Sequence, residues 1–244
     1  MDSKKLKSIE KCPIVDSIIE IRFETSIDSN AVFGVIYGQI LDMYKGKVQN
    51  LPESQLPPAV RESNPALRYK PLYKIEGDKT IIQIGPNVIC LGAKIPYKGW
   101  DEFSSIFKKI INKLLRVQII TRVTRLGIRY VDFFPGDIKN NITMKLVMNE
   151  KYTPIGEFIR STIIDEGFYN VIQFYNNVNY NNVKTKEITV GSLIDIDTSK
   201  EYSDSYFLEH LEDELNIGHD KNKKLFVATL EPDFLESLNP QYYD

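Results

Sequence analysis

Arg125 and Arg129 are spaced in a way that suits the binding of an anion. They stand in a stretch, 123–134, that is rich in β-branched and aromatic residues and predicts a strand. Residues of equal parity share one face of a strand, so both guanidinium groups can pair with a phosphate or carboxylate there. Glu20 and Arg22, on an earlier predicted strand, are candidate members of the same ligand-binding site. The alternative is structural, an internal lattice of ion pairs on the sheet, for example Arg129 with Glu20.

Asp195 and Asp197 are candidates for a metal site. They alternate on one face of a predicted strand, and paired aspartates supply oxygen ligands of the kind that divalent cations prefer. With Gly191 and Ser192 upstream, they are similar to the Gly-Ser and Asp-x-Asp signature of nucleotidyltransferases. In that signature the Gly-Ser turn lies well before the aspartates, whereas only two residues intervene here. A solvated strand face is the alternative interpretation.

Tyr169, Phe174, Tyr175 and Tyr180 cluster next to an asparagine-rich stretch at 176–182. We predict that they form an exposed aromatic patch that binds a protein partner. The alternative is that these side chains fill the core or an internal interface.

Motifs for cofactor binding or covalent catalysis are absent from the sequence. It contains no G-x-x-x-x-G-K-[ST], no G-x-G-x-x-G and no G-x-S-x-G run. His210 and His219 are the only histidines, and no second His-Asp pair accompanies His219-Asp220. We therefore expect no cofactor and no catalytic residues.

Hydrophobic periodicity predicts the elements that must position these residues. Strands are expected at 13–24, 67–76, 79–84, 88–91, 123–134, 158–164, 169–175 and 188–196. Helices are expected after the capping residues 28–30 with a stop near Gly46, at 101–115, and from about 204 with a break at Gly218. Residues 50–66 carry four prolines and predict a long connection, 176–182 predict a turn, and 138–148 predict a short helix or irregular strand.

The order of these elements repeats. Residues 1–118 read as strand, helix, three strands and helix, and residues 119–244 repeat this plan with one uncertain element. This indicates an α+β fold of two tandem β-α-β-β-β-α units, with antiparallel strands and helices packed on one face. The plan is similar to the saddle-shaped, duplicated fold of the TATA-binding-protein-like group, a likeness of topology only.

Bulk composition excludes several classes of protein. The formal net charge of −2 does not favour nucleic acid as a ligand, and two distant cysteines in 244 residues do not suggest a disulfide scaffold. No apolar run approaches the roughly 20 residues of a membrane span, and the charged start lacks the apolar core of a signal peptide. We expect a cytoplasmic protein without membrane association.

Four pieces of the sequence, in order, are similar to a family of sporadically distributed bacterial and archaeal proteins. They are PIVDSIIEIRF (13–23), IQIGPNVI (82–89), YKGW (97–100) with Phe103, and RLGIRYVD (125–132). The resemblance covers most of the chain but implies no activity, because none is established for the family. Patchy distribution is common for genes of mobile elements and of defence or toxin–antitoxin islands. Asp132 departs from the family pattern, which has Asn there.

Three hypotheses follow. The first is a non-enzymatic interaction protein, a regulatory or antitoxin-like component of a phage-defence or mobile-element system, with a protein partner encoded by a neighbouring gene. The second is a nucleotide or nucleic-acid binding module on the face of Arg125 and Arg129. The third is a metal-dependent enzyme centred on Asp195 and Asp197. A homo-oligomer is compatible with each.

Overall fold

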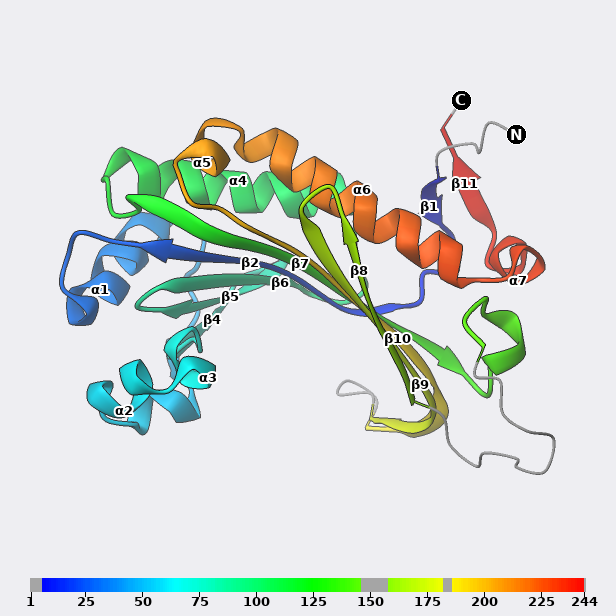
Figure 1. The fold of residues 1–244 in the computed structure, drawn as a ribbon. Helices are drawn as coiled ribbons and strands as arrows, with labels where there is room; N and C mark the ends of the chain where they lie inside the picture. Colours follow the sequence, from blue (N-terminus) through cyan, green and yellow to red (C-terminus); the bar gives the residue numbers. More distant parts are fainter. Residues whose placement is uncertain (1–5, 146–157, 182–185, 244) are drawn as a thin grey trace. The chain divides into compact units, whose positions relative to one another are not determined.

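The computed structural model describes residues 6–145, 158–181 and 186–243 (Figure 1). The helices are α1 (Ser29–Ile40), α2 (Pro58–Ser63), α3 (Pro65–Arg68), α4 (Trp100–Arg116), α5 (Tyr206–Glu209), α6 (Leu211–Thr229) and α7 (Pro232–Ser237), with 3-10 turns η1 (Pro52–Gln55) and η2 (Lys139–Asn141). The strands are β1 (Leu6–Ile9), β2 (Ile14–Glu24), β3 (Gln49–Asn50), β4 (Tyr73–Glu76), β5 (Thr80–Gly85), β6 (Val88–Ala93), β7 (Arg122–Pro135), β8 (Phe158–Asp165), β9 (Phe168–Asn181), β10 (Ile188–Glu201) and β11 (Pro240–Tyr242).

The fold class is α+β, as predicted, with 34% helix and 40% strand. Nine strands form an open antiparallel sheet in the order β3-β4-β5-β6-β2-β7-β10-β9-β8. A separate two-stranded sheet pairs β1 with β11. Among the described helices, none is long and apolar enough to cross a membrane.

The chain divides into two compact units. Unit 1 contains the described parts of 1–16, 129–198 and 219–244, and unit 2 contains 17–128 and 199–218. These units do not coincide with the predicted halves, 1–118 and 119–244. The difference arises because β2, β7, β10 and α6 each supply residues to both units.

The core of unit 2 follows from the alternation of β2. Ile19, Ile21 and Phe23 are at most 1% exposed, whereas Ile18, Glu20 and Arg22 between them are only half-buried. Helices cover the buried face with Val32, Ile36 and Ile40 from α1 and Phe103, Phe107, Ile110, Ile111 and Leu114 from α4. Burial of one strand face against two amphipathic helices is the main stabilising contribution.

The core of unit 1 lies on the even-numbered residues of its long strands. Phe134 of β7, Ile172 and Phe174 of β9, and Ile194 and Ile196 of β10 pack with residues of α6 and α7. Phe226 belongs to α6 and Leu235 to α7, whereas Leu230 and Leu238 directly follow the ends of these two helices. The odd-numbered residues of the same strands therefore form the opposite face.

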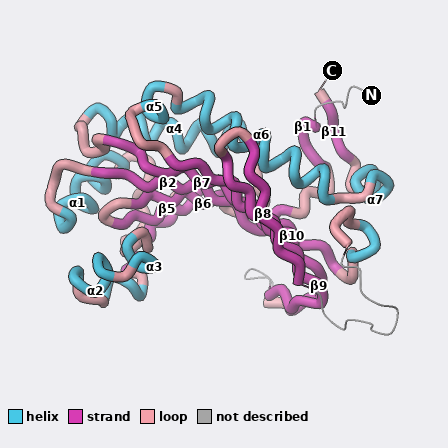
Figure 2. Tube along the Cα trace, viewed as in Figure 1, coloured by secondary structure: helices cyan, strands magenta, loops and turns pink. Residues whose placement is uncertain are grey.

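Most predicted strands and the helix at 101–115 are confirmed with small shifts of their ends. The predicted strands 79–84 and 88–91 form a hairpin, since Gly85 pairs with Val88 across Pro86 and Asn87. Residues 50–66 contradict the prediction of a connection without helix, because they contain η1, α2 and the start of α3 (Figure 2). Pro58 and Pro65 occupy the first turn of their helices, where the missing N–H costs nothing.

Three further predictions are wrong. β4 begins at Tyr73 and not at residue 67, because α3 occupies 65–68. The prediction of a turn at 176–182 is wrong, because β9, which lies between β10 and β8 in the sheet, continues as a strand to Asn181. Gly218 does not break the last helix, because α6 is continuous from Leu211 to Thr229 and tertiary packing outweighs a single glycine. Of the uncertain stretch 138–148, residues 139–141 form η2, and residues from 146 lie outside the described ranges.

Candidate functional site

Arg125 pairs with Glu20 in unit 2. Arg125 Nη1 donates to Glu20 Oε1 over 2.7 Å, and Arg22 Nε donates to the same oxygen over 3.0 Å. The other carboxylate oxygen accepts from the Cys90 thiol at 3.7 Å. The side chains of Arg125 and Glu20 are only 15% and 22% exposed. The Glu20 carboxylate therefore neutralises the Arg125 guanidinium. This is the arrangement expected of an internal lattice of ion pairs, the alternative to a site that binds an external anion.

The surroundings of this ion pair hold it in place. A Cβ on Gly127 would lie 2.6 Å from Arg125 Nη1, so the guanidinium rests on a position that has no side chain. Arg22 lies over the ring of Tyr69, 4.6 Å from its centroid. Burial raises the pKa of the Cys90 thiol, and the negative charge of Glu20 raises it further. Cys90 therefore remains a protonated donor.

Arg129 pairs with Asp195 in unit 1. Arg129 Nε and Nη2 donate to the two carboxylate oxygens over 2.8 and 2.7 Å, a bidentate geometry. Gln173 Nε2 donates to Asp195 Oδ2 over 3.2 Å, and Tyr175 Oη donates to Gln173 Oε1 over 3.1 Å. The hydrogen bonding between Arg129 and Asp195 raises the pKa of the Arg129 guanidinium above its usual value, although burial alone would lower it. The guanidinium is 44% exposed and the carboxylate 6%, so only the arginine reaches solvent appreciably.

The two arginines do not act on one carboxylate. Glu20 accepts from Arg125 and Arg22, whereas Asp195 accepts from Arg129, so the example pairing of Arg129 with Glu20 is wrong. The register between distant strands decides this, since 105 residues separate Glu20 from Arg125. Binding of an external ligand by these residues remains a prediction.

Asp132 lies on the core face of β7 and is 3% exposed. Burial raises the pKa of its carboxyl from 3.8 to about 8, and the negative charge of Asp195 contributes to the shift. The residue is therefore mostly protonated at neutral pH, and it is the position at which the family resemblance implies Asn. A neutral side chain suits this site.

Gly191 and Ser192, the Gly-Ser pair before the aspartates, have structural roles. A Cβ on Gly191 would clash with the carbonyl oxygen of Phe134 and the ring of Phe133, so glycine permits close approach to β7. The Ser192 hydroxyl lies 2.9 Å from the Gly136 carbonyl and 2.8 Å from Asn176 Oδ1. The signature therefore anchors strands here.

In the described part of the chain, Asp195 and Asp197 are not joined by the further ligands that a metal ion needs. Asp195 is committed to Arg129 and Gln173, and Asp197 contributes to the negative potential around Arg129. Within the described ranges, no three His, Cys, Asp or Glu side chains gather as potential ligands. A metal at Asp195 and Asp197 would require displacement of the arginine.

The four predicted aromatic residues fall into different environments. Tyr169 is 49% exposed, Tyr175 and Tyr180 are half-buried, and Phe174 is fully buried. The prediction of an exposed Phe174 is wrong, because the even-numbered residues of β9 from Phe168 to Asn176 face the core. The alternation changes beyond Asn177, whose φ is +55°. Tyr180 stacks on Phe133 with ring centroids 4.5 Å apart, so it belongs to the face opposite the core.

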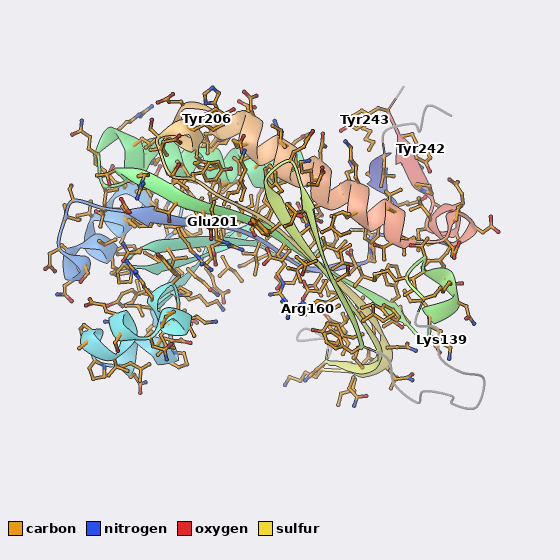
Figure 3. All side chains as sticks on the ribbon, in the orientation of Figure 1. Lys139, Arg160, Glu201, Tyr206, Tyr242 and Tyr243 are labelled. Atoms are coloured by element: carbon orange, nitrogen blue, oxygen red, sulfur yellow. The ribbon has the colours of Figure 1, made fainter. Side chains whose placement is uncertain are left out.

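A surface of which the sequence predicted only Tyr169 and Tyr175 runs along β8 and β9, and we call it the β8–β9 strip. Its members face one another in register: Phe158 with Tyr175, Arg160 with Gln173, Thr162 with Val171 and Ile164 with Tyr169. Phe158 and Ile164 are 55% and 66% exposed, and Phe158 stacks on Tyr175 with centroids 4.6 Å apart. Arg160, labelled in Figure 3, stands between Phe158 and Ile164 in the sequence of β8. The adjacent isoleucines of β8, Ile163 and Ile164, were the signal that the sequence offered for this surface.

Comparison with known proteins adds no relative. No protein-family model matches the chain, and no curated protein matches it. The family resemblance of the four sequence pieces therefore stays a prediction.

Proposed function

We propose that the protein is a binding protein whose partner adds an extended segment to the edge of β8. The observation that carries this proposal is the exposure of β8. It is the last strand of the nine-stranded order, it pairs with β9 over all eight residues, and it exposes Phe158, Ile163 and Ile164. An edge strand presents unpaired backbone donors and acceptors to a partner strand.

The sequence of β8 supports such pairing. Edge strands that avoid association are usually very short, bulged, or interrupted by Lys or Pro. β8 contains neither Lys nor Pro, its charged residues are Arg160 and the terminal Asp165, and its register with β9 has no bulge. Apolar side chains exposed beside unpaired backbone are typical of an interaction site.

The strip specifies the chemistry of the partner. On its exposed face, Phe158 and Ile164 flank Arg160, and no carboxylate within the described ranges pairs with Arg160. The partner segment would place apolar side chains near the two ends and an acidic one near Arg160. A second copy of this chain fits less well, because centred antiparallel pairing puts Arg160 opposite Ile163 and Phe158 opposite Asp165.

The strand order supports a duplicated plan within this proposal. Read outward from the middle, β2-β6-β5-β4 and β7-β10-β9-β8 follow the same pattern, as two tandem β-α-β-β-β-α units would. In this comparison β8 corresponds to β4, and β4 is flanked by β3. The partner segment would occupy at β8 the place that β3 occupies at β4.

The biological role that we propose is occlusion. A rigid strand edge that captures a segment buries it, and an antitoxin-like component of a defence or mobile-element system acts in this way on its target. The partner would be encoded by a neighbouring gene. This setting rests on the family resemblance, whereas the mode of binding rests on β8.

The test uses matched substitutions at two exposed isoleucines of unit 1. Ile164→Lys places a charge on the strip, and Ile188→Lys places the same charge on β10, where Ile188 is 69% exposed. The tagged parent and both variants are used to recover proteins from native cells, and each recovered protein is quantified relative to the bait. We expect one protein at near-stoichiometric level with the parent and Ile188→Lys and its loss with Ile164→Lys.

Two results would contradict the proposal. One is the recovery of no protein by the parent, and the other is equal recovery by Ile164→Lys. Size-exclusion chromatography with light scattering is run on all three proteins. A dimer that dissociates only in Ile164→Lys would assign the edge to a second copy and overturn the choice of partner.

A further inference from the structure

Unit 2 contains a cleft whose lining includes none of Arg22, Arg125 and Arg129. Its volume is about 730 Å³, within the range of roughly 300–1,000 Å³ that small-molecule sites occupy. The walls come from α1, from the segment with η1, α2 and α3, from β4, and from the turn between β5 and β6. All of these lie in residues 29–87, within one compact unit.

The lining of the cleft is positively charged. It contains Arg61 of α2, Arg68 of α3 and Lys70, against a single carboxylate, Glu62. No carboxylate in the described part of the chain forms an ion pair with any of the three cations. This contrasts with Arg125 and Arg129 on the strands, which the protein neutralises itself.

Arg61 has an unsatisfied donor. Its Nε is buried and finds no acceptor among the described residues. A buried donor without an acceptor costs about 1–3 kcal/mol. The Nε itself is closed to solvent, but Arg61 lines the cleft and has no carboxylate partner among the described residues. Phosphate oxygens match the geometry of a guanidinium group.

Aromatic side chains complete the site. Phe33 of α1 and Tyr73 of β4 both line the cleft and stack with ring centroids 3.9 Å apart. Asn87, also in the lining, is held by its side chain to the Phe23 carbonyl at 3.1 Å. The cleft therefore combines cations, an aromatic wall and a fixed polar side chain, as a ligand with an anionic and a flat heterocyclic part requires.

We propose that this cleft binds a nucleoside phosphate. Arg61, Arg68 and Lys70 contact the phosphate groups, and the Phe33–Tyr73 wall contacts the base. This site is independent of strand addition at β8, because the cleft uses residues 29–87 and β8 belongs to the other unit. Failure of one proposal leaves the other unchanged.

Calorimetric titration of the full chain with ATP, GTP, CTP and UTP, and with pyrophosphate, tests the proposal. We expect at least one nucleotide to bind with one site per chain, more tightly than pyrophosphate. Arg61→Gln and Lys70→Gln each weaken that binding about tenfold or more, the effect of losing one charged hydrogen bond. Arg116→Gln is the matched control, because Arg116 is exposed at the end of α4 and does not line the cleft.

Phe33→Leu separates recognition of the base from recognition of the phosphate. It weakens the nucleotide several-fold and leaves pyrophosphate unchanged, and circular dichroism confirms that each variant is folded. The proposal is overturned if no nucleotide binds, if Arg61→Gln and Lys70→Gln bind as the parent does, or if pyrophosphate binds as tightly as every nucleotide. A single-stranded 12-mer that binds more tightly than the nucleotides and competes with them would assign the cleft to nucleic acid instead.

Discussion

At the scale of single residues, position within a strand decides the state of each ionisable group. Asp195 and Asp132 are carboxyl groups of unit 1 with opposite surroundings. Asp195 accepts three hydrogen bonds from Arg129 and Gln173. Asp132 points into the core, where burial raises its pKa to about 8. In the sequence, Asp132 looks like an ordinary acidic residue. In the folded protein its carboxyl group is buried and is neutral at low and neutral pH.

Asp132→Asn should change the dependence of stability on pH. The folded protein holds this proton up to about pH 8, whereas the ordinary pKa is 3.8. The free energy of unfolding of the parent therefore falls as pH rises between these values, and the loss is on the order of a few kcal/mol. Asn carries no proton to lose, so the variant should gain relative stability with rising pH. Urea unfolding at pH 5, 6, 7 and 8 measures this.

The control for that series is Asp137→Asn, because Asp137 is exposed in the same unit. It should follow the parent at every pH. If the difference between Asp132→Asn and the parent stays constant from pH 5 to pH 8, Asp132 is ionised in the folded state and the argument fails.

At the scale of elements, glycine has different consequences in a helix and at its cap. Gly34 and Gly38 are exposed within α1, and a Cβ at either would meet no atom within 4 Å. Gly99 precedes α4 with a φ of +104°, a conformation that other residues rarely adopt. The same substitution should therefore have opposite signs at the two places.

Gly34→Ala and Gly38→Ala should each stabilise the protein by about 0.5–1 kcal/mol, because Ala restricts the unfolded chain and favours helix. Gly99→Ala should destabilise it by about 1–2 kcal/mol through backbone strain. Chemical denaturation of the three variants measures both signs. If Gly34→Ala or Gly38→Ala destabilised the protein, the added Cβ would be meeting another group, and the prediction would be wrong.

At the scale of the whole molecule, the two candidate binding surfaces belong to different compact units. The cleft is built within unit 2 and the β8–β9 strip within unit 1. The residues that form each surface all belong to one unit, so neither surface uses residues of the other unit to bind its ligand or partner.

Substitutions on the two surfaces should therefore act independently. Ile164→Lys should leave the nucleotide affinity within about twofold of the parent, and Arg61→Gln should leave recovery of the protein partner unchanged. In the double variant, each binding free energy should change by the sum of its changes in the two single variants, as expected for sites that share no residues. A departure of more than about 1 kcal/mol from this sum would demonstrate coupling between the surfaces.

Local pattern was enough for the periodic parts of the fold. The alternation at 13–24 and 123–134 and the helical spacing at 101–115 predict elements that are present. When one face of a strand or helix is buried, apolar residues recur along the sequence with the period of that element. The same reasoning failed at 50–66, where proline reads as interruption although it also begins helices, and at Gly218, where propensity is weaker than packing.

By itself, the sequence determined the α+β class, most strands and the helix at 101–115. Only the tertiary structure decided that Arg125 meets Glu20 and Arg129 meets Asp195, that β8 is an edge, and that Arg61, Arg68 and Lys70 surround a cleft. The reason is that periodicity is a property of adjacent residues. The partner of a charge, the neighbour of a strand and the walls of a cleft depend on which distant segments become adjacent.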